Sequence, residues 1–164
     1  GGGTGAFLTA VGTAYPDLKL HLFDLPQVIA PASQRFAENG LSERATITGG
    51  SFRTDPLPQG ADAISLIRVL YDHSDETVRG LLAKAHAALP TGGRIIISEP
   101  MSGGARPERA GDAYFGLYCL AMGTGRARSA AEIGQHLQDA GLTDFRPCKT
   151  ARSFITSVLE ARKA

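Results

Sequence analysis

The chain has 164 residues and 43% of them are hydrophobic; 17 Lys and Arg stand against 16 Asp and Glu, for a formal net charge of +1. A chain of this length can bury about 70% of the surface that its unfolded form exposes, so its core requires no disulfide or structural metal. The near-neutral charge argues against nucleic acid as a partner, because a nucleic-acid-binding protein gathers a surplus of basic residues on one face.

The cysteine pattern and the hydropathy exclude further classes. Cys119 and Cys148 lie far apart and outside any CxxC spacing, which predicts two reduced thiols and neither a metal site nor a redox pair. No apolar stretch approaches the roughly 18 uninterrupted residues of a transmembrane segment, and no signal peptide is recognisable. We therefore expect a cytoplasmic protein.

Up to Pro100, short apolar runs alternate with longer segments whose apolar residues recur every three or four positions. Strand followed by helix, repeated, predicts an α/β fold: a doubly wound parallel sheet with helices on both faces. The predicted strands are 18–23, 45–48, 61–70 and 94–98, and the predicted helices are 5–15, 26–38 and 75–89.

Beyond Pro100 the pattern changes. A connector rich in Gly, Pro and Arg leads to predicted helices at 112–122 and 129–140. Two strands, 143–149 and 152–159, follow with only Thr150 and Ala151 between them. So short a joint predicts a hairpin, and therefore an antiparallel pair at the end of the sheet.

The opening glycines precede a predicted helix. Gly1, Gly3 and Gly5 read as G-x-G-x-G, and Gly1, Gly3 and Ala6 also satisfy the dinucleotide pattern G-x-G-x-x-G/A. Such glycines let the backbone approach a ligand at a helix N-terminus. About 20 residues on, Asp24 ends a predicted strand, where a carboxylate can accept hydrogen bonds from the ribose hydroxyls of NAD or of S-adenosylmethionine. Asp24 as the N-cap of the next helix is the competing interpretation.

Two further groups of residues follow predicted strands. Ser51 and Phe52 could flank an adenine, although Phe52 could equally be a core residue. Tyr71, Asp72 and His73 form a titratable cluster after strand 61–70, which is typical of an active site. The alternative is a polar turn in which Ser74 or Asp75 caps the next helix.

Motifs along the whole chain carry a resemblance to a known family. In order they are GGGTGAF, LFDLPQV, GGSFRTDPLPQGAD, RVLYDHSDE, LPTGGRIIISEP, GRARSAAEI and FITSV. Together they resemble the O-methyltransferases that include caffeic acid O-methyltransferase. RVLYDHSDE, GDAYFGLYCLAMGTGRARS and RSFITSV resemble in particular the bacterial subgroup that methylates carotenoid hydroxyls, the demethylspheroidene type.

The resemblance implies a Rossmann-like seven-stranded sheet with an antiparallel last strand, and S-adenosylmethionine as methyl donor. It implies a hydroxylated carotenoid as the acceptor; a phenolic or polyketide acceptor is the alternative, and an NAD-dependent oxidoreductase a more distant one. Carried over by position, Gly1, Gly3 and Gly5 shape the loop under the methionine portion and Asp24 holds the ribose. Ser51 and Phe52 lie near the adenine, although many relatives have Asp at the position of Ser51.

The catalytic triplet departs from the family pattern. The phenolic members have His-Asp-Trp where this chain has Tyr71, Asp72 and His73. A phenol with a pKa near 10 accepts a proton poorly at neutral pH, whereas the imidazole of His73 titrates near neutrality. Asp72 would then orient the proton acceptor.

The resemblance also implies that the first strand and an N-terminal helical dimerisation domain lie outside this chain. The whole protein would be a homodimer with a small hydrophobic substrate, in peripheral contact with a membrane. A parallel sheet without a central strand leaves backbone groups unpaired, so we expect the isolated chain to be unstable and inactive.

Several other polar and aromatic residues admit simpler interpretations. Helix 112–122 carries Tyr114, Phe115 and Tyr118, which could be core or could line a polyene-binding wall. Arg126 and Arg128 are expected to pair with carboxylates or solvent. Structural roles are expected for the remaining histidines, His21, His86 and His136.

Overall fold

The computed structural model describes residues 1–152 and 155–164. The chain divides into two compact units, Gly1–Pro58 and Gln59–Ala164, and each is described by itself. Both units combine helices with β-strands, which confirms the predicted α/β class.

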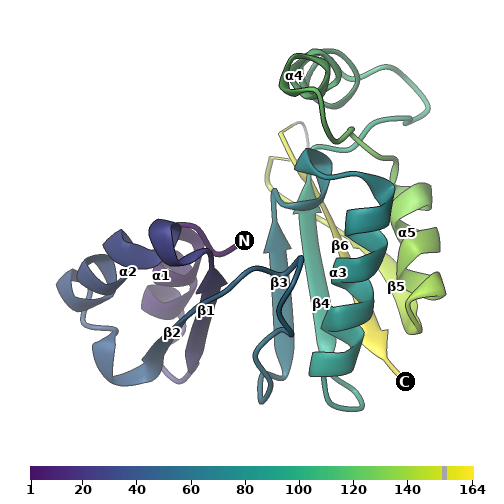
Figure 1. Ribbon diagram of the computed structural model, residues 1–164. Coiled ribbons are helices and arrows are strands. Elements are labelled where there is room, and N and C mark those ends of the chain that lie inside the picture. Colours follow the sequence, from purple (N-terminus) through teal and green to yellow (C-terminus); the bar gives the residue numbers. More distant parts are fainter. Residues whose placement is uncertain (153–154) are drawn as a thin grey trace. The chain divides into compact units, whose positions relative to one another are not determined.

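The first unit is a two-stranded parallel sheet with its helices (Figure 1). Helix α1 (Ala6–Ala14) leads to β1 (Leu20–Asp24), and α2 (Pro26–Glu38) connects β1 to β2 (Ala45–Gly49). The two strands pair in register up to Asp24↔Gly49, so their carboxyl ends lie together. The buried core consists of Leu20, Leu22, Ala32, Phe36 and Leu41.

The second unit is built on a four-stranded mixed sheet in the order β3-β4-β6-β5. Strands β3 (Ala63–Ile67) and β4 (Arg94–Glu99) are parallel to each other. The last strand, β6 (Ser157–Lys163), is antiparallel both to β4 and to β5 (Leu142–Cys148). The predicted antiparallel ending is therefore confirmed.

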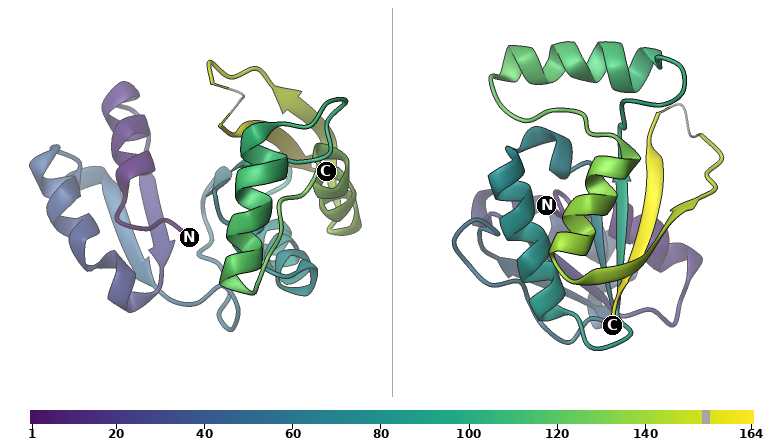
Figure 2. Two further views of the ribbon diagram at one scale, coloured as in Figure 1. Left: turned by 90° about the horizontal axis from the view of Figure 1, so that it is seen from above. Right: turned by 90° about the vertical axis from the view of Figure 1, so that its right-hand side faces the viewer.

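The helices of the second unit occupy two places. α3 (Asp75–Ala88) and α5 (Ala130–Asp139) contact each other and lie on the same side of the sheet (Figure 2). α4 (Phe115–Met122) follows a π-helical turn, Arg109–Tyr114, and lies beyond the end at which β3 finishes (Figure 1). None of the described helices is both long and apolar enough to cross a membrane.

Two predicted boundaries are corrected by the structure. The joint between the last two strands is longer than Thr150 and Ala151, because β5 ends at Cys148 and β6 begins only at Ser157. A two-residue hairpin favours Asn-Gly or Gly in the turn, which Thr-Ala does not provide. Of the predicted strand 152–159 and the motif RSFITSV, residues 153 and 154 lie outside the described residues. Predicted strand 61–70 ends at Ile67, and its last residue belongs instead to the 3₁₀ turn Leu70–Asp72.

Candidate functional site

In the first unit, the opening loop lies against the carboxyl end of β1. The backbone N–H of Gly2 donates to the carbonyl of Phe23 at 3.0 Å, and that of Gly5 donates back to Gly2 at 3.1 Å. Gly5 has a φ of 79°, and a Cβ there would meet the Phe36 ring at 2.9 Å. A side chain at this position would therefore be unfavourable for two reasons: the positive φ, and the close contact with the Phe36 ring.

Asp24 lies at the tip of β1 with its carboxylate held by two backbone amides. One oxygen accepts from Gly3 N at 2.7 Å and the other from Leu25 N at 2.7 Å. The N-cap residue of α2 is Leu25, and no side chain caps the helix, so the N-cap interpretation of Asp24 is wrong. A carboxylate can accept about four hydrogen bonds, so Asp24 retains capacity for hydroxyl donors.

The segment after β2 adjoins the carboxyl end of β1. Gly50 N donates to the backbone carbonyl of Asp24 at 2.9 Å, which brings the two strand ends into direct contact. Ser51 begins a tight turn in which its N–H donates to the Asp55 carboxylate at 2.8 Å and its hydroxyl accepts from Arg53 N at 3.3 Å. Phe52 is half-buried in the same turn. The predicted nucleoside-binding residues of this unit are thus brought to one edge.

In the second unit, the predicted catalytic triplet lies on a turn at the carboxyl end of β3. Tyr71 and Asp72 belong to the 3₁₀ turn Leu70–Asp72, and His73 N donates to the carbonyl of Leu70 at 3.2 Å. Ser74 then caps α3 by accepting a hydrogen bond from Thr77 N. The capping interpretation is confirmed for Ser74.

Tyr71 is packed among aromatic rings. Its ring centroid lies 5.2 Å from that of Phe115 and 5.8 Å from that of Tyr118, and the Arg68 guanidinium lies 5.8 Å above it. Burial, with a smaller contribution from the charge of Asp72, raises the pKa of Tyr71 to about 12. The phenol therefore stays protonated at neutral pH.

Glu99, the last residue of β4, binds the backbone of this turn. It was not identified from the sequence. Its carboxylate accepts from Val69 N at 2.7 Å, Leu70 N at 2.8 Å and Tyr71 N at 3.2 Å, and its side chain is buried. Burial raises its pKa to about 7, against the opposing effect of the three N–H donors. The alternation along β4 contained the signal, because Glu99 falls two residues after Ile97 on the buried face of the strand.

Arg68 is a second residue that the sequence did not indicate. Its φ of 58° places a non-glycine residue in the left-handed region, directly after β3. Such backbone strain is concentrated at functional sites. The side chain extends over the Tyr71 and Phe115 rings, with guanidinium-to-centroid distances of 5.8 and 5.5 Å.

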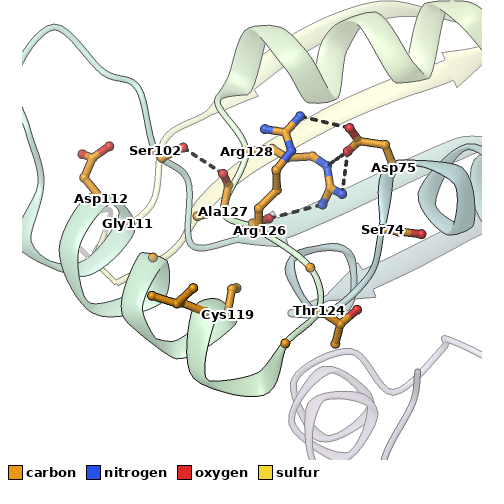
Figure 3. Close-up of a pocket in the computed structure, with 14 residues that line it drawn as sticks. Ser74, Asp75, Ser102, Gly111, Asp112, Cys119, Thr124, Arg126, Ala127 and Arg128 are labelled. Atoms are coloured by element: carbon orange, nitrogen blue, oxygen red, sulfur yellow. Dashed lines mark hydrogen bonds and ion pairs between the residues drawn. The ribbon is translucent and has the colours of Figure 1, made fainter.

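The two arginines before α5 pair with carboxylates, as predicted. Arg126 lies 2.7 Å from Glu132 and 3.2 Å from Asp75, and Arg128 lies 2.7 Å from Asp75. They line a cavity of about 760 Å³ between α4 and the start of α3 (Figure 3). The predicted catalytic triplet is not among the residues that line this cavity.

α4 has both buried and exposed side chains. Phe115 and Cys119 are buried against Tyr71, and Tyr118 packs beside them. Four large side chains are between 58% and 78% exposed: Tyr114, which directly precedes the helix, and Leu117, Leu120 and Met122 within it. The core interpretation therefore holds for part of the helix only.

The three histidines and two cysteines to which the sequence assigned no catalytic role have the following contacts. His21 is hydrogen-bonded to Thr48 Oγ1 at 2.8 Å across β1 and β2, and the backbone carbonyl of His86 accepts from Lys163 Nζ at 2.9 Å. His136 Nε2 lies 3.8 Å from Asp75 Oδ1. Cys119 and Cys148 are both free thiols.

Comparison with known proteins gives the family. Residues 1–143 match the model of the O-methyltransferase domain. This chain belongs to that family. The resemblance inferred from the motifs is thereby confirmed, and the NAD-dependent alternative is excluded.

Individual relatives show where within the family the similarity is high. The chain is 57% identical to demethylspheroidene O-methyltransferase of Cereibacter sphaeroides over 161 residues, which are 98% of this chain and 42% of that protein. It is 34% identical to 3-hydroxy-5-methyl-1-naphthoate 3-O-methyltransferase of Streptomyces sahachiroi, over 100% of this chain and 48% of that protein. Human N-acetylserotonin methyltransferase in complex with SAM superposes with a TM-score of 0.87 at 31% identity, covering 100% of this chain and 46% of that one. The chain thus spans less than half the length of these relatives.

The buried Glu99 carboxylate predicts an unusual pH dependence of stability. Its pKa of about 7 in the folded protein exceeds the ordinary 4.5, so between these values the folded state binds more protons than the unfolded state. The free energy of unfolding should therefore fall by up to about 3 kcal/mol from this group as the pH rises through that window. We expect Glu99→Gln to flatten this pH slope when denaturant unfolding of the full-length protein is measured between pH 4.5 and 8.

The exposed Glu76→Gln variant of α3 is the matched control and should keep the wild-type slope. If the free energy of unfolding had the same pH slope in wild type and in Glu99→Gln, the assignment of this pH dependence to Glu99 would be contradicted.

Proposed function

We propose that this chain is part of the catalytic domain of an S-adenosylmethionine-dependent O-methyltransferase that methylates a hydroxyl of an acyclic hydroxycarotenoid in carotenoid biosynthesis. The observation that carries the acceptor is the 57% identity to demethylspheroidene O-methyltransferase over nearly the whole chain, against 34% to the naphthoate enzyme. A phenolic or polyketide acceptor is the alternative that the naphthoate relative represents.

The residues at the end of β1 fit the nucleoside of S-adenosylmethionine. Asp24 is oriented by Gly3 N and Leu25 N and can accept hydrogen bonds from both ribose hydroxyls. Gly1, Gly3 and Gly5 permit close approach of the loop backbone to the methionine portion, while Ser51 and Phe52 are assigned to the adenine.

S-adenosylmethionine, when bound, supplies a methyl group on a positively charged sulfur. The chain's own residues must then align the acceptor hydroxyl and remove its proton as the new C–O bond forms. Tyr71, with its high pKa, serves as a hydrogen-bond donor rather than a base. Proton acceptance is assigned to His73, with Asp72 orienting it.

The exposed apolar side chains of α4 and of the residue before it are assigned to the hydrocarbon part of the acceptor. Tyr114, Leu117, Leu120 and Met122 expose apolar surface without a charged side chain among them. A polyene offers no hydrogen-bonding groups along its length, so such a surface binds it by apolar contact.

The whole protein is proposed to be larger than this chain. Among the described strands, β1 pairs only with β2 and β3 pairs only with β4, so each leaves one edge with unpaired backbone groups. A further strand from the remainder of the protein would bring the six described strands to the seven that the family resemblance implies. We further assign to that remainder an N-terminal helical domain that forms a homodimer, with peripheral membrane contact giving access to a lipid-soluble acceptor.

The proposed activity predicts a defined acceptor preference. The full-length protein should transfer the radiolabelled methyl group of S-adenosylmethionine to demethylspheroidene presented in detergent micelles, and the product should be identified by mass spectrometry. Methylation of a dihydroxynaphthoate, with no transfer to the carotenoid, would contradict the proposed acceptor.

The role of Asp24 predicts a loss of cofactor affinity. Because hydrogen bonds to a charged group contribute about 1.5–3 kcal/mol, Asp24→Asn should raise the Kd for S-adenosylhomocysteine about 10-fold to 100-fold in calorimetry. The exposed Asp17→Asn variant, which makes the same change of charge before β1, should bind like wild type. Equal Kd values for Asp24→Asn and wild type would remove Asp24 from the site.

A further inference from the structure

The backbone of Arg128 is fixed before its side chain makes any contact. Ser102 N donates to the Arg128 carbonyl at 3.1 Å, and Met101 forms a parallel bridge with Arg128. The next residue, Ser129, caps α5 through a reciprocal capping box with Glu132. The side chain of Arg128 therefore starts from a defined position between β4 and α5.

The guanidinium of Arg128 is only 1% exposed and is surrounded by acceptors. It donates to the backbone carbonyls of Leu70 at 2.8 Å, His73 at 2.7 Å and Arg126 at 3.3 Å. Its Nε donates to Asp75 Oδ1 at 2.8 Å, and a terminal nitrogen lies 2.7 Å from the same oxygen (Figure 3). Asp75 thus balances the buried charge, while both terminal nitrogens also donate to carbonyls of the turn, one to Leu70 and the other to His73.

The turn is consequently held at both ends by buried side chains, the carboxyl group of Glu99 and the guanidinium of Arg128. Its leading N–H groups donate to Glu99, and the carbonyls that flank Tyr71 and Asp72 accept from Arg128. The loop before Arg128 also contacts the turn, because a Cβ on Gly125 would lie 2.1 Å from the Tyr71 carbonyl oxygen. The turn has little freedom to shift relative to β3.

We propose that Arg128 is a positioning residue for methyl transfer: by fixing the carbonyls of Leu70 and His73, it sets where the side chains of Asp72 and His73 lie. The proposal rests on the proposed methyltransferase function. A planar guanidinium binds several acceptors at fixed angles, which the single ammonium of lysine cannot reproduce. Arg128 therefore affects the rate of methyl transfer, whereas Asp24 determines the affinity for the nucleoside.

The test is a series of substitutions in the full-length protein. Because small displacements of reacting groups cost up to about 100-fold in rate, Arg128→Lys should lower kcat about 10-fold to 100-fold. Arg128→Met, which has no donor, should lower kcat further, so that lysine partly rescues the site. The Kd for S-adenosylhomocysteine and the KM for the acceptor should stay within about twofold of wild type.

Arg126→Lys is the matched control. Arg126 contacts the same Asp75 carboxylate, but its side chain is 46% exposed and its guanidinium binds the side chains of Asp75 and Glu132 rather than the backbone of the turn. Its kcat should stay within about twofold of wild type. Asp75→Asn is a second, milder perturbation of the Arg128 guanidinium, and it serves as the test if Arg128→Lys does not fold. We expect it to lower kcat and to leave the Kd for S-adenosylhomocysteine unchanged.

Two results would overturn the proposal. One is a wild-type kcat in Arg128→Lys, or in Asp75→Asn where Arg128→Lys does not fold. The other is a parallel loss of kcat, thermal stability and S-adenosylhomocysteine binding, which a purely structural residue would give. If the wild-type protein methylates a phenol instead of the carotenoid, the proposed acceptor is wrong. The same series of variants then tests the role of Arg128 with that phenol as the acceptor.

Discussion

The carboxylate of Glu99 is the interaction on which the candidate site depends. Three consecutive N–H groups, from Val69 to Tyr71, converge on it inside the protein, where no water is needed to satisfy them. A buried carboxylate is costly unless it is well hydrogen-bonded, and unpaired buried amides are costly as well. Each side therefore stabilises the other, and the chain can leave β3 in a tight turn rather than continue as a strand.

The positive charge of Arg128 complements this arrangement at the other end of the turn. Its guanidinium accepts no hydrogen bond, so the carbonyls of Leu70 and His73 are natural partners once it is buried. Asp75, at the first position of α3, neutralises it; burial raises the pKa of Asp75, but hydrogen bonds from Arg128 and Arg126 outweigh this and hold the pKa below its usual value. The turn that carries Tyr71, Asp72 and His73 is thus held through its backbone, by Glu99 at its N–H groups and by Arg128 at two of its carbonyls.

Local sequence patterns predicted most of the elements and the edge that carries the proposed nucleoside-binding residues. The alternation of strands and helices and the position of Asp24 after β1 depend on residues close together in the sequence, which is why they could be inferred. Helix α2 begins and ends where the pattern placed it, at Pro26 and Glu38. The hairpin joint was underestimated because Thr150 and Ala151 lack a turn signal, and strand ends depend on pairing rather than on local preference.

The contacts of Glu99 and Arg128 with the Leu70–Asp72 turn could not be inferred in this way. Glu99 contacts amides about 30 positions earlier in the chain, and Arg128 contacts carbonyls more than 50 positions earlier. The sequence indicated that Arg128 would pair with a carboxylate, but not that its other donors would bind the turn. Likewise, the high pKa of Tyr71 depends on burial beside Phe115 and Tyr118 of α4, a packing that no local pattern reveals.

A crystal structure of the full-length protein with S-adenosylhomocysteine tests the central claim most directly. The account predicts Asp24 within hydrogen-bonding distance of the ribose hydroxyls, and the Leu70–Asp72 turn still bound by Glu99 and Arg128 with Asp72 and His73 facing the sulfur. A ligand bound away from Asp24, or a turn released from Glu99 and Arg128, would contradict it.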